Sequence, residues 1–160
     1  MGNLHISEDF INLIKTITET KYIYAREGTR WTQNFSNWTS TPLKLTTSST
    51  NDSSMFIHDS TNKKVKIGAG VSQIELTALV NWMSVSNSGE FDLQIIINGI
   101  QKYLLYNEVV RNTNINMIGS ATIPPFVVDV NEGDEIQLCL FGNVSSAEIL
   151  RTHLLIKKIK

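Results

Sequence analysis

The side chains most capable of chemistry are widely spaced along this chain. His5, His58 and His153 have no His, Cys or carboxylate partner at the short spacing that metal ligands require. Acidic residues cluster within residues 129–135, at a predicted turn, but their order is not that of an EF-hand loop. We therefore interpret this cluster as a solvated turn and expect neither a metal site nor a cofactor.

Patterns typical of a catalytic centre are missing from the sequence. None of the serines lies in a G-x-S-x-G motif, and no phosphate-binding glycine loop occurs. The acids show no obvious pairing of the kind that glycosidases need. The single cysteine, Cys139, lies in the apolar run 136–141, which predicts a buried, inert thiol. The sequence does not predict an enzyme.

Two tryptophans in a polar stretch are candidates for ligand binding. Trp31 and Trp38 flank Asn34 and Asn37 in a segment rich in Ser, Thr and Asn. Aromatic faces combined with amide side chains suit the recognition of a sugar. The alternative, which we favour, is that both rings fill the joint between an N-terminal segment and the domain that follows it.

Two polar loops are the other candidate contacts for a receptor. Residues 112–116 and residues 143–146 each join two predicted strands. Binding residues concentrate on such loops, because a rigid scaffold positions them. The candidate ligand-binding residues are therefore Trp31, Asn34, Trp38, Asn114 and Asn143.

Length and charge restrict the class of protein. The chain has 160 residues, is 41% hydrophobic and carries a formal net charge of −1, which fits one domain with a continuous core. A near-neutral chain without clustered Lys and Arg argues against a nucleic-acid partner. No apolar run approaches the ~20 residues of a membrane span, and the N-terminus lacks the features of a signal peptide. We expect a soluble protein made in a cytoplasm, with no membrane partner.

One helix is predicted, over residues 7–24. Ser7 can cap it, and Phe10, Leu13 and Ile17 recur at the 3-4 spacing of a coiled-coil seam. The seam is only about two heptads long, so the helix needs additional contacts to be stable. It either packs on its own domain or ends a three-stranded stalk. We expect an attachment or stalk segment over residues 1–27 and a head domain over residues 28–160.

Strand and turn signals fill the rest of the chain. Residues 42–45 are predicted as an edge strand because of Pro42, and the Ser/Thr-rich residues 46–54 as a loop. The long strand 74–85 alternates so that Ile74 and every second residue to Trp82 face one side. Apolar residues on its other face, Met83 among them, predict a strand covered on both sides.

Later turns have equally clear chemistry. Asn98-Gly99 predicts a type I′ hairpin between strands 91–97 and 100–110, because both positions tolerate a positive φ. Pro124-Pro125 predicts a bend or restart within strand 117–130, and residues 131–134 predict a tight turn. Many short strands at regular spacing predict an antiparallel two-sheet sandwich, either immunoglobulin-like or jelly-roll.

From residue 64 onward the chain resembles the C1q/TNF-like jelly-roll superfamily, in its phage-fibre or bacterial surface-protein variants. The resemblance is carried by residues 64–70 leading into strand 74–85, by the hairpin entry 91–99, and by the Gly-Asp turn within 128–140. It implies an all-β antiparallel jelly-roll that forms a homotrimer about a threefold axis. Candidate residues for the trimer interface are Phe10, Leu13, Ile17, Trp82 and Met83.

These inferences together predict a trimeric structural or adhesion protein of a phage virion, either a head fibre or a tail-fibre knob. The N-terminal segment would attach it to other virion proteins, and polar loops would face a host glycan or receptor. Alternatives are a spore or cell-surface TNF-like protein and a lone carbohydrate-binding module. A secreted signalling ligand and a carbohydrate-active enzyme are further alternatives that the sequence supports less well.

Overall fold

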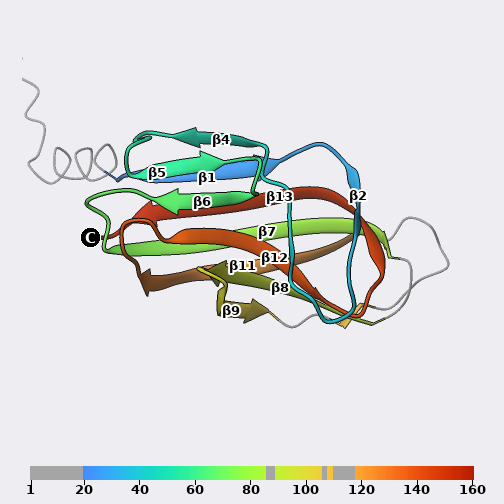
Figure 1. Ribbon diagram of the computed structural model, residues 1–160. Helices are drawn as coiled ribbons and strands as arrows, with labels where there is room; N and C mark the ends of the chain where they lie inside the picture. Colours follow the sequence, from blue (N-terminus) through green and yellow to red (C-terminus); the bar gives the residue numbers. More distant parts are fainter. Residues whose placement is uncertain (1–19, 86–88, 106–107, 110–117) are drawn as a thin grey trace, which may run out of the picture.

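The computed structural model describes residues 20–85, 89–105, 108–109 and 118–160, which form two antiparallel sheets packed face to face (Figure 1). The six-stranded sheet has the order β11-β7-β13-β1-β4, with β2 also paired to β13. Its strands are β1 (Tyr22–Glu27), β2 (Trp31–Asn34), β4 (Thr47–Thr50), β7 (Gln73–Val85), β11 (Ile118–Asp129) and β13 (Ser146–Lys158). The predicted all-β sandwich is confirmed.

The seven-stranded sheet has the order β10-β8-β12-β6-β5, with β3 paired to β12 and β9 paired to β8. Its strands are β3 (Thr41–Pro42), β5 (Phe56–Asp59), β6 (Lys64–Ile67), β8 (Gly89–Ile97), β9 (Ile100–Leu105), β10 (Glu108–Val109) and β12 (Glu135–Gly142). In the description that follows, the outer face of a sheet is the side that points away from the other sheet.

Strand β7 alternates as predicted. Its inward side chains are almost fully buried between the sheets, namely those of Ile74, Leu76, Ala78, Val80 and Trp82. The Trp82 indole lies over Gly119, its cross-strand partner on β11, where an added Cβ would be 2.4 Å from the ring. The glycine therefore makes room for the largest side chain of the core.

The predicted turns and the proline irregularity are confirmed. Asn98 and Gly99 have φ values of 52° and 77°, so both adopt the left-handed conformation of a type I′ turn. Gly133 also has a positive φ, 92°, in the turn before β12. The register between β11 and β7 shifts between Ile123 and Phe126, where the two prolines cannot donate ladder hydrogen bonds.

Three sequence predictions need correction. The predicted helix is wrong for residues 20–24, because residues 20 and 21 are not helical and β1 occupies residues 22–24, paired with both β13 and β4; residues 7–19 lie outside the described residues. The six-stranded sheet thus includes residues upstream of the boundary predicted between 27 and 28. The predicted edge strand 42–45 is shorter and begins one residue earlier, as β3, Thr41–Pro42. The predicted loop 46–54 contains β4, a Ser/Thr-rich strand held by β1 rather than by its own propensity. No helix long and apolar enough to cross a membrane occurs in the described ranges.

Residues 35–46, which we call the crossing segment, connect the two sheets. The segment leaves β2 beside β13, follows β12, and then returns to the six-stranded sheet at β4 (Figure 1). The amide of Leu43 donates to the Leu138 carbonyl at 2.9 Å, and the side chains of Leu43 and Leu45 are fully buried. The crossing segment therefore contributes side chains to the hydrophobic core and also connects the two sheets.

The start of β1 and the end of β13 lie at the same end of the sandwich (Figure 1). Tyr22 pairs with Lys157, and the Lys158 amide donates to the Lys21 carbonyl at 2.8 Å. The opposite end is formed by the end of β12, the start of β13 and the first part of the crossing segment. The molecule thus has a terminal end and a distal end.

Candidate functional site

Trp31 belongs to the six-stranded sheet. It pairs with Ile149 of β13 and its half-buried ring packs against the core. The indole N–H donates to the Gln33 side chain at 3.2 Å, and the Lys44 ammonium lies 5.5 Å from the ring centroid. These contacts give Trp31 a mainly structural environment, with a cation over its outer side.

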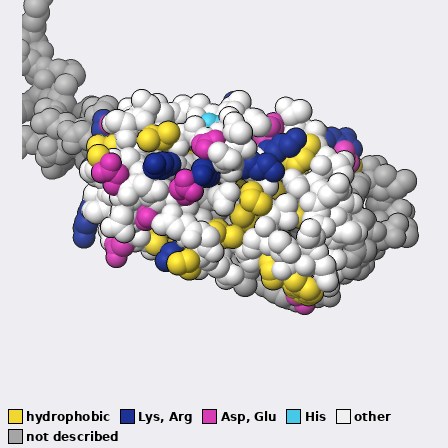
Figure 2. Space-filling model, viewed as in Figure 1, with side chains coloured by type: hydrophobic (Ala, Val, Ile, Leu, Met, Phe, Trp, Pro, Cys, Tyr) yellow, Lys and Arg dark blue, Asp and Glu magenta, His cyan; other side chains and the backbone are white. Residues whose placement is uncertain are grey.

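Trp38 lies at the distal end, next to the seven-stranded sheet. Its amide donates to the Gly142 carbonyl at 2.7 Å, and its ring lies 5.5 Å from that of Phe141 at an angle of 53°. The side chain is 45% exposed, and its backbone has a positive φ of 52°. Hydrophobic side chains gather at the end of the molecule where β12 finishes (Figure 2). The two tryptophans, for which the sequence offered a shared platform or a shared joint, thus attach to different sheets.

The asparagine predictions have separate outcomes. Asn34 is exposed at the end of β2, beside Ser146. The Asn143 side-chain oxygen accepts the amide of Glu90 at 2.8 Å and lies against Gly89, so this exposed side chain has a structural role. Asn114 lies outside the described residues.

The predicted trimer residues are also distributed differently. Trp82 faces the core, 6% exposed, and is therefore not on the outer face of the six-stranded sheet. Met83, the next residue along β7, points to that outer face and is half-buried. Phe10, Leu13 and Ile17 lie outside the described residues.

The outer face of the six-stranded sheet carries a broad set of half-buried apolar and aromatic side chains. Tyr24 pairs with Leu155, which pairs with Thr77, and Leu79 pairs with His153 in the adjacent row. Val127 on β11 is 54% exposed. Towards the terminal end of this face, the Lys157 ammonium binds the Glu75 carboxylate at 2.9 Å.

His153 lies in the middle of this face. The Tyr24 hydroxyl is hydrogen-bonded to its Nδ1. Burial lowers the pKa of His153 below its ordinary value, and the positive charges of Arg151 and Arg26 lower it further. This part of the face therefore owes its positive charge to the two arginines, and the same environment favours the neutral form of the imidazole.

The outer face of the seven-stranded sheet has the opposite chemistry, because its central polar side chains are buried. Asp92, Gln94 and Cys139 are 4%, 2% and 1% exposed. The Ser40 hydroxyl, from the crossing segment, donates to the Gln94 side-chain oxygen at 2.8 Å. Burial raises the pKa of the Cys139 thiol to about 12, although the charge of Lys63 lowers it slightly. The predicted inert thiol is supported by this environment.

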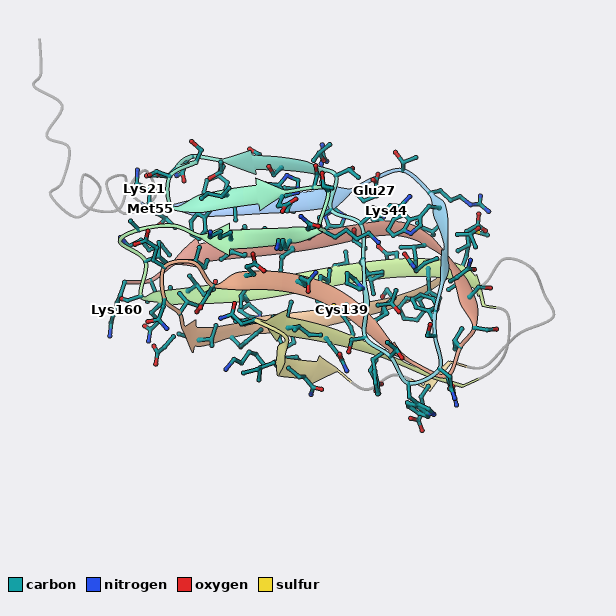
Figure 3. The ribbon with its side chains drawn as sticks, viewed as in Figure 1. Lys21, Glu27, Lys44, Met55, Cys139 and Lys160 are labelled. Atoms are coloured by element: carbon teal, nitrogen blue, oxygen red, sulfur yellow. The ribbon has the colours of Figure 1, made fainter. Side chains whose placement is uncertain are left out.

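A buried carboxylate near the end of β1 was not found from the sequence. Glu27 is 7% exposed, and both the Thr29 amide and the Thr46 hydroxyl donate to it at 2.6 Å. Burial raises its pKa, but these hydrogen bonds outweigh burial and the net shift is downward. The hydroxyl of Thr152, the cross-strand partner of Glu27, donates to the Lys44 carbonyl at 2.6 Å and so joins the Lys44 backbone to this cluster; Figure 3 labels Glu27 and Lys44. Only the pairing of distant segments creates this cluster, so no local sequence signal marks it.

Metal-binding geometry is not found in the part of the chain that the structure describes. No group of three or more His, Cys, Asp or Glu side chains is close enough there to hold an ion. Its four ion pairs join Lys or Arg to a carboxylate on or near the surface. The surfaces described above suit contact with another molecule.

Comparisons with known proteins identify the fold. No protein-family model matches the sequence, and no curated protein matches it. Murine APRIL is similar in structure, with a TM-score of 0.59 at 10% identity over 88% of this chain and 100% of that chain. Eiger TNF from S. frugiperda gives 0.59 at 6% identity, covering 88% of this chain and 92% of that one.

A viral protein has the same fold. Vertex protein P5 of phage PRD1 superposes with a TM-score of 0.54 at 10% identity, over 88% of this chain and 97% of that one. The chain therefore has a TNF-like jelly-roll fold, which confirms the resemblance predicted from the sequence. At these identities the similarity shows the fold alone.

Proposed function

We propose that this protein is a trimeric structural or adhesion protein of a phage virion, either a head fibre or the receptor-binding knob of a tail fibre. The observation that carries the proposal is the TNF-like fold over 88% of the chain, which a phage vertex protein shares. In this role the protein is not an enzyme. The residues that matter are those that make contact, on the faces and at the distal end of the sandwich.

The proposed trimer uses the outer face of the six-stranded sheet. Tyr24, Leu79 and Leu155 give this face apolar area that remains partly exposed in the single chain. Burial of such area is the main favourable term in stable association. The resemblance to the C1q/TNF-like superfamily implies the same arrangement, with one sheet of each subunit packed about a threefold axis.

The positions of the chain ends support a role in attachment and display. Lys21 precedes β1 at the terminal end, so the upstream segment starts from that end and would reach other virion proteins there. The distal end, with the exposed Trp38, points the other way. A knob held at its terminal end would therefore present the distal end to a host glycan or receptor.

Mass in solution tests the trimer. Light scattering of the full chain should give three times 18.0 kDa. Leu155→Asp places a charge on the proposed interface and should give the monomer mass, because a buried unpaired carboxylate is costly. Ile57→Asp is the matched control, since Ile57 is 46% exposed on the outer face of the other sheet and its variant should stay trimeric. A monomeric wild type would reject the trimer.

A second variant separates the head from the upstream segment. A chain that starts at Thr20 keeps β1, whereas a start at residue 29 would remove a strand of the six-stranded sheet. If the head alone makes the trimer, the shortened chain keeps three times the monomer mass. A monomeric shortened chain would assign the trimer to the predicted seam of Phe10, Leu13 and Ile17.

The virion location needs its own test. An antibody against the protein should label virus particles purified from a lysate of the source culture. Detection only as free protein in the medium would favour the second candidate, a soluble ligand, which the superpositions of APRIL and Eiger TNF support with a TM-score of 0.59 against 0.54 for the vertex protein. Detection on spores or cell envelopes would favour a cell-surface TNF-like protein.

A further inference from the structure

We propose that Trp38 and Phe141 form a binding subsite for a neutral sugar ring at the distal end of the molecule. The proposal deepens the adhesion function and rests on it, but it does not require the trimer. Trp38 adjoins the seven-stranded sheet, whereas the proposed trimer uses the outer face of the six-stranded sheet. Both surfaces can therefore be occupied at once.

The geometry of the aromatic pair suits a sugar. The two ring centroids are 5.5 Å apart and the ring planes meet at 53°, so the rings form an open corner rather than a closed stack. Phe141 is half-buried and supports the pair from the sheet, while Trp38 stays 45% exposed. An exposed indole face is the surface on which the C–H side of a pyranose packs.

The backbone at Trp38 is a second, independent observation. Its φ of 52° lies in the left-handed region, which favours glycine or asparagine and is uncommon for a bulky side chain. The hydrogen bond that the Trp38 backbone N–H donates to the Gly142 carbonyl holds this conformation. Glycine would adopt this backbone conformation with less strain, so folding does not require a tryptophan at this position. We attribute the indole to contact with another molecule.

The polar group beside the pair selects the class of sugar. Asn37 is exposed beside Trp38 and can hydrogen-bond to sugar hydroxyls. The two aromatic rings and this amide offer C–H packing and neutral hydrogen bonds, and none of the three supplies a cation for the carboxylate of a sialic acid or for a sulfate. The subsite should therefore take a neutral hexose or N-acetylhexosamine.

The test uses the full chain with a defined set of probes: neutral oligosaccharides of glucose, galactose and N-acetylglucosamine, and sialyllactose as the anionic comparison. Binding is measured by saturation-transfer NMR and by titration. At least one neutral probe should bind saturably, with transfer to its C–H protons, and sialyllactose should bind more weakly. Absence of saturable binding by every neutral probe would overturn the proposal.

Three variants assign the binding to the aromatic corner. Trp38→Ala removes the indole, and Trp38→Gly removes it with a residue that fits the positive φ, so the second variant guards against misfolding. Both should weaken binding by about tenfold or more, the loss expected for one well-used aromatic contact. Ile57→Ala, with a side chain of similar exposure elsewhere on the sheet, should bind as the wild type does. Unchanged binding in Trp38→Gly would overturn the proposal.

The outcomes distinguish this subsite from the wider function. A trimer that binds none of the neutral probes rejects the subsite and leaves the trimeric virion protein standing. A monomer whose sugar binding depends on Trp38 rejects the trimer and supports a lone carbohydrate-binding module. Mass and binding are measured on the same samples, so each failure is attributed to one proposal.

Discussion

The side chains on the outer faces of the two sheets are covered in different ways. On the seven-stranded sheet, the central polar side chains are buried and their hydrogen bonds are made within the chain, as between Ser40 and Gln94. On the six-stranded sheet, apolar side chains such as Leu79 and Leu155 lie in rows and stay partly exposed. The centre of the first face is completed by its own chain, while Ile57 on the edge strand β5 stays exposed. The second face keeps apolar area available for a partner. The comparison shows that alternation along a strand assigns side chains to two faces of a sheet but does not tell what covers each face.

The largest expected effect is the low reactivity of the cysteine thiol on the outer face of the seven-stranded sheet. Cys139 is 1% exposed with a pKa raised from 9.0 to about 12, so its thiolate population near neutral pH is about a thousandfold below that of an ordinary cysteine. A disulfide reagent should therefore modify the native protein very slowly and the denatured protein at once. Ser60→Cys, exposed in the turn between β5 and β6, adds a thiol that should react at the rate of a free cysteine. Fast modification of Cys139 in the native wild type would show that the outer face of the seven-stranded sheet is not covered around this thiol.

The next contrast concerns stability. Leu43→Ala removes a fully buried side chain of the crossing segment and should cost about 2–5 kcal/mol of the free energy of unfolding. The loss should not depend on protein concentration, because this side chain packs within one chain. Leu155→Ala should instead lower stability in a concentration-dependent way, since in the proposed trimer Leu155 packs against a second copy of the chain. Urea unfolding at two protein concentrations measures the stability loss of both variants. If the two losses depend equally on concentration, Leu155 does not differ from Leu43 in packing against a second copy.

A smaller effect is expected from the buried hydrogen bond. Ser40→Ala leaves the buried Gln94 oxygen without its donor, which should cost about 1–2 kcal/mol. Thr39→Ala is the matched control, because its exposed hydroxyl donates to the Asn37 carbonyl at 3.3 Å in a solvated turn. Its variant should unfold at nearly the wild-type urea concentration. If both variants lose the same stability, the polar side chains of this face are not organised by the crossing segment.

The smallest effect is a pH dependence on the open face. The folded-state pKa of His153 is lowered, so the unfolded chain takes up the proton first as the pH falls. Stability is complete above the ordinary histidine value of 6.5 and is lost as the pH falls from there towards the lowered folded value. Urea midpoints between about pH 7 and pH 5 should fall more for the wild type than for His153→Gln. The lowered pKa of Glu27 adds a separate loss at more acidic pH in both proteins, so the difference between them isolates His153.

Much of the fold was predictable from local chemistry. The Asn98-Gly99 turn needs two positive φ values that these residues tolerate, and the inward series from Ile74 to Trp82 follows from a period of two. Strand β4 was not predictable, because its Ser and Thr residues become a strand only through pairing with β1. The helix prediction failed at residues 22–24 for the same reason, since β1 lies between β13 and β4.

The candidate site was less predictable than the fold. Sequence reasoning found Trp31 and Trp38 and treated them as a pair, either as a sugar platform or, as favoured, as the filling of one joint, whereas the crossing segment moves the chain from one sheet to the other between them. Phe141 was not among the candidate binding residues, because it lies beside Trp38 only when the chain crosses to the seven-stranded sheet. Trp82 alternates inward with the core residues of β7, so its place in the core followed from the period alone.

The shared position of the chain ends has a mechanical consequence. A knob tethered upstream of Tyr22 and gripped at Trp38 is pulled along the axis of β1, whose hydrogen bonds to β13 and β4 lie across that direction. The load is then shared by all of these bonds in shear. Pulling Lys21 away from Lys160 would instead open the β1–β13 pair one bond at a time, like a zipper. The same strand pair should therefore resist a strong pull in the direction in which an attached particle would be tugged, and yield to a weak one between its own ends.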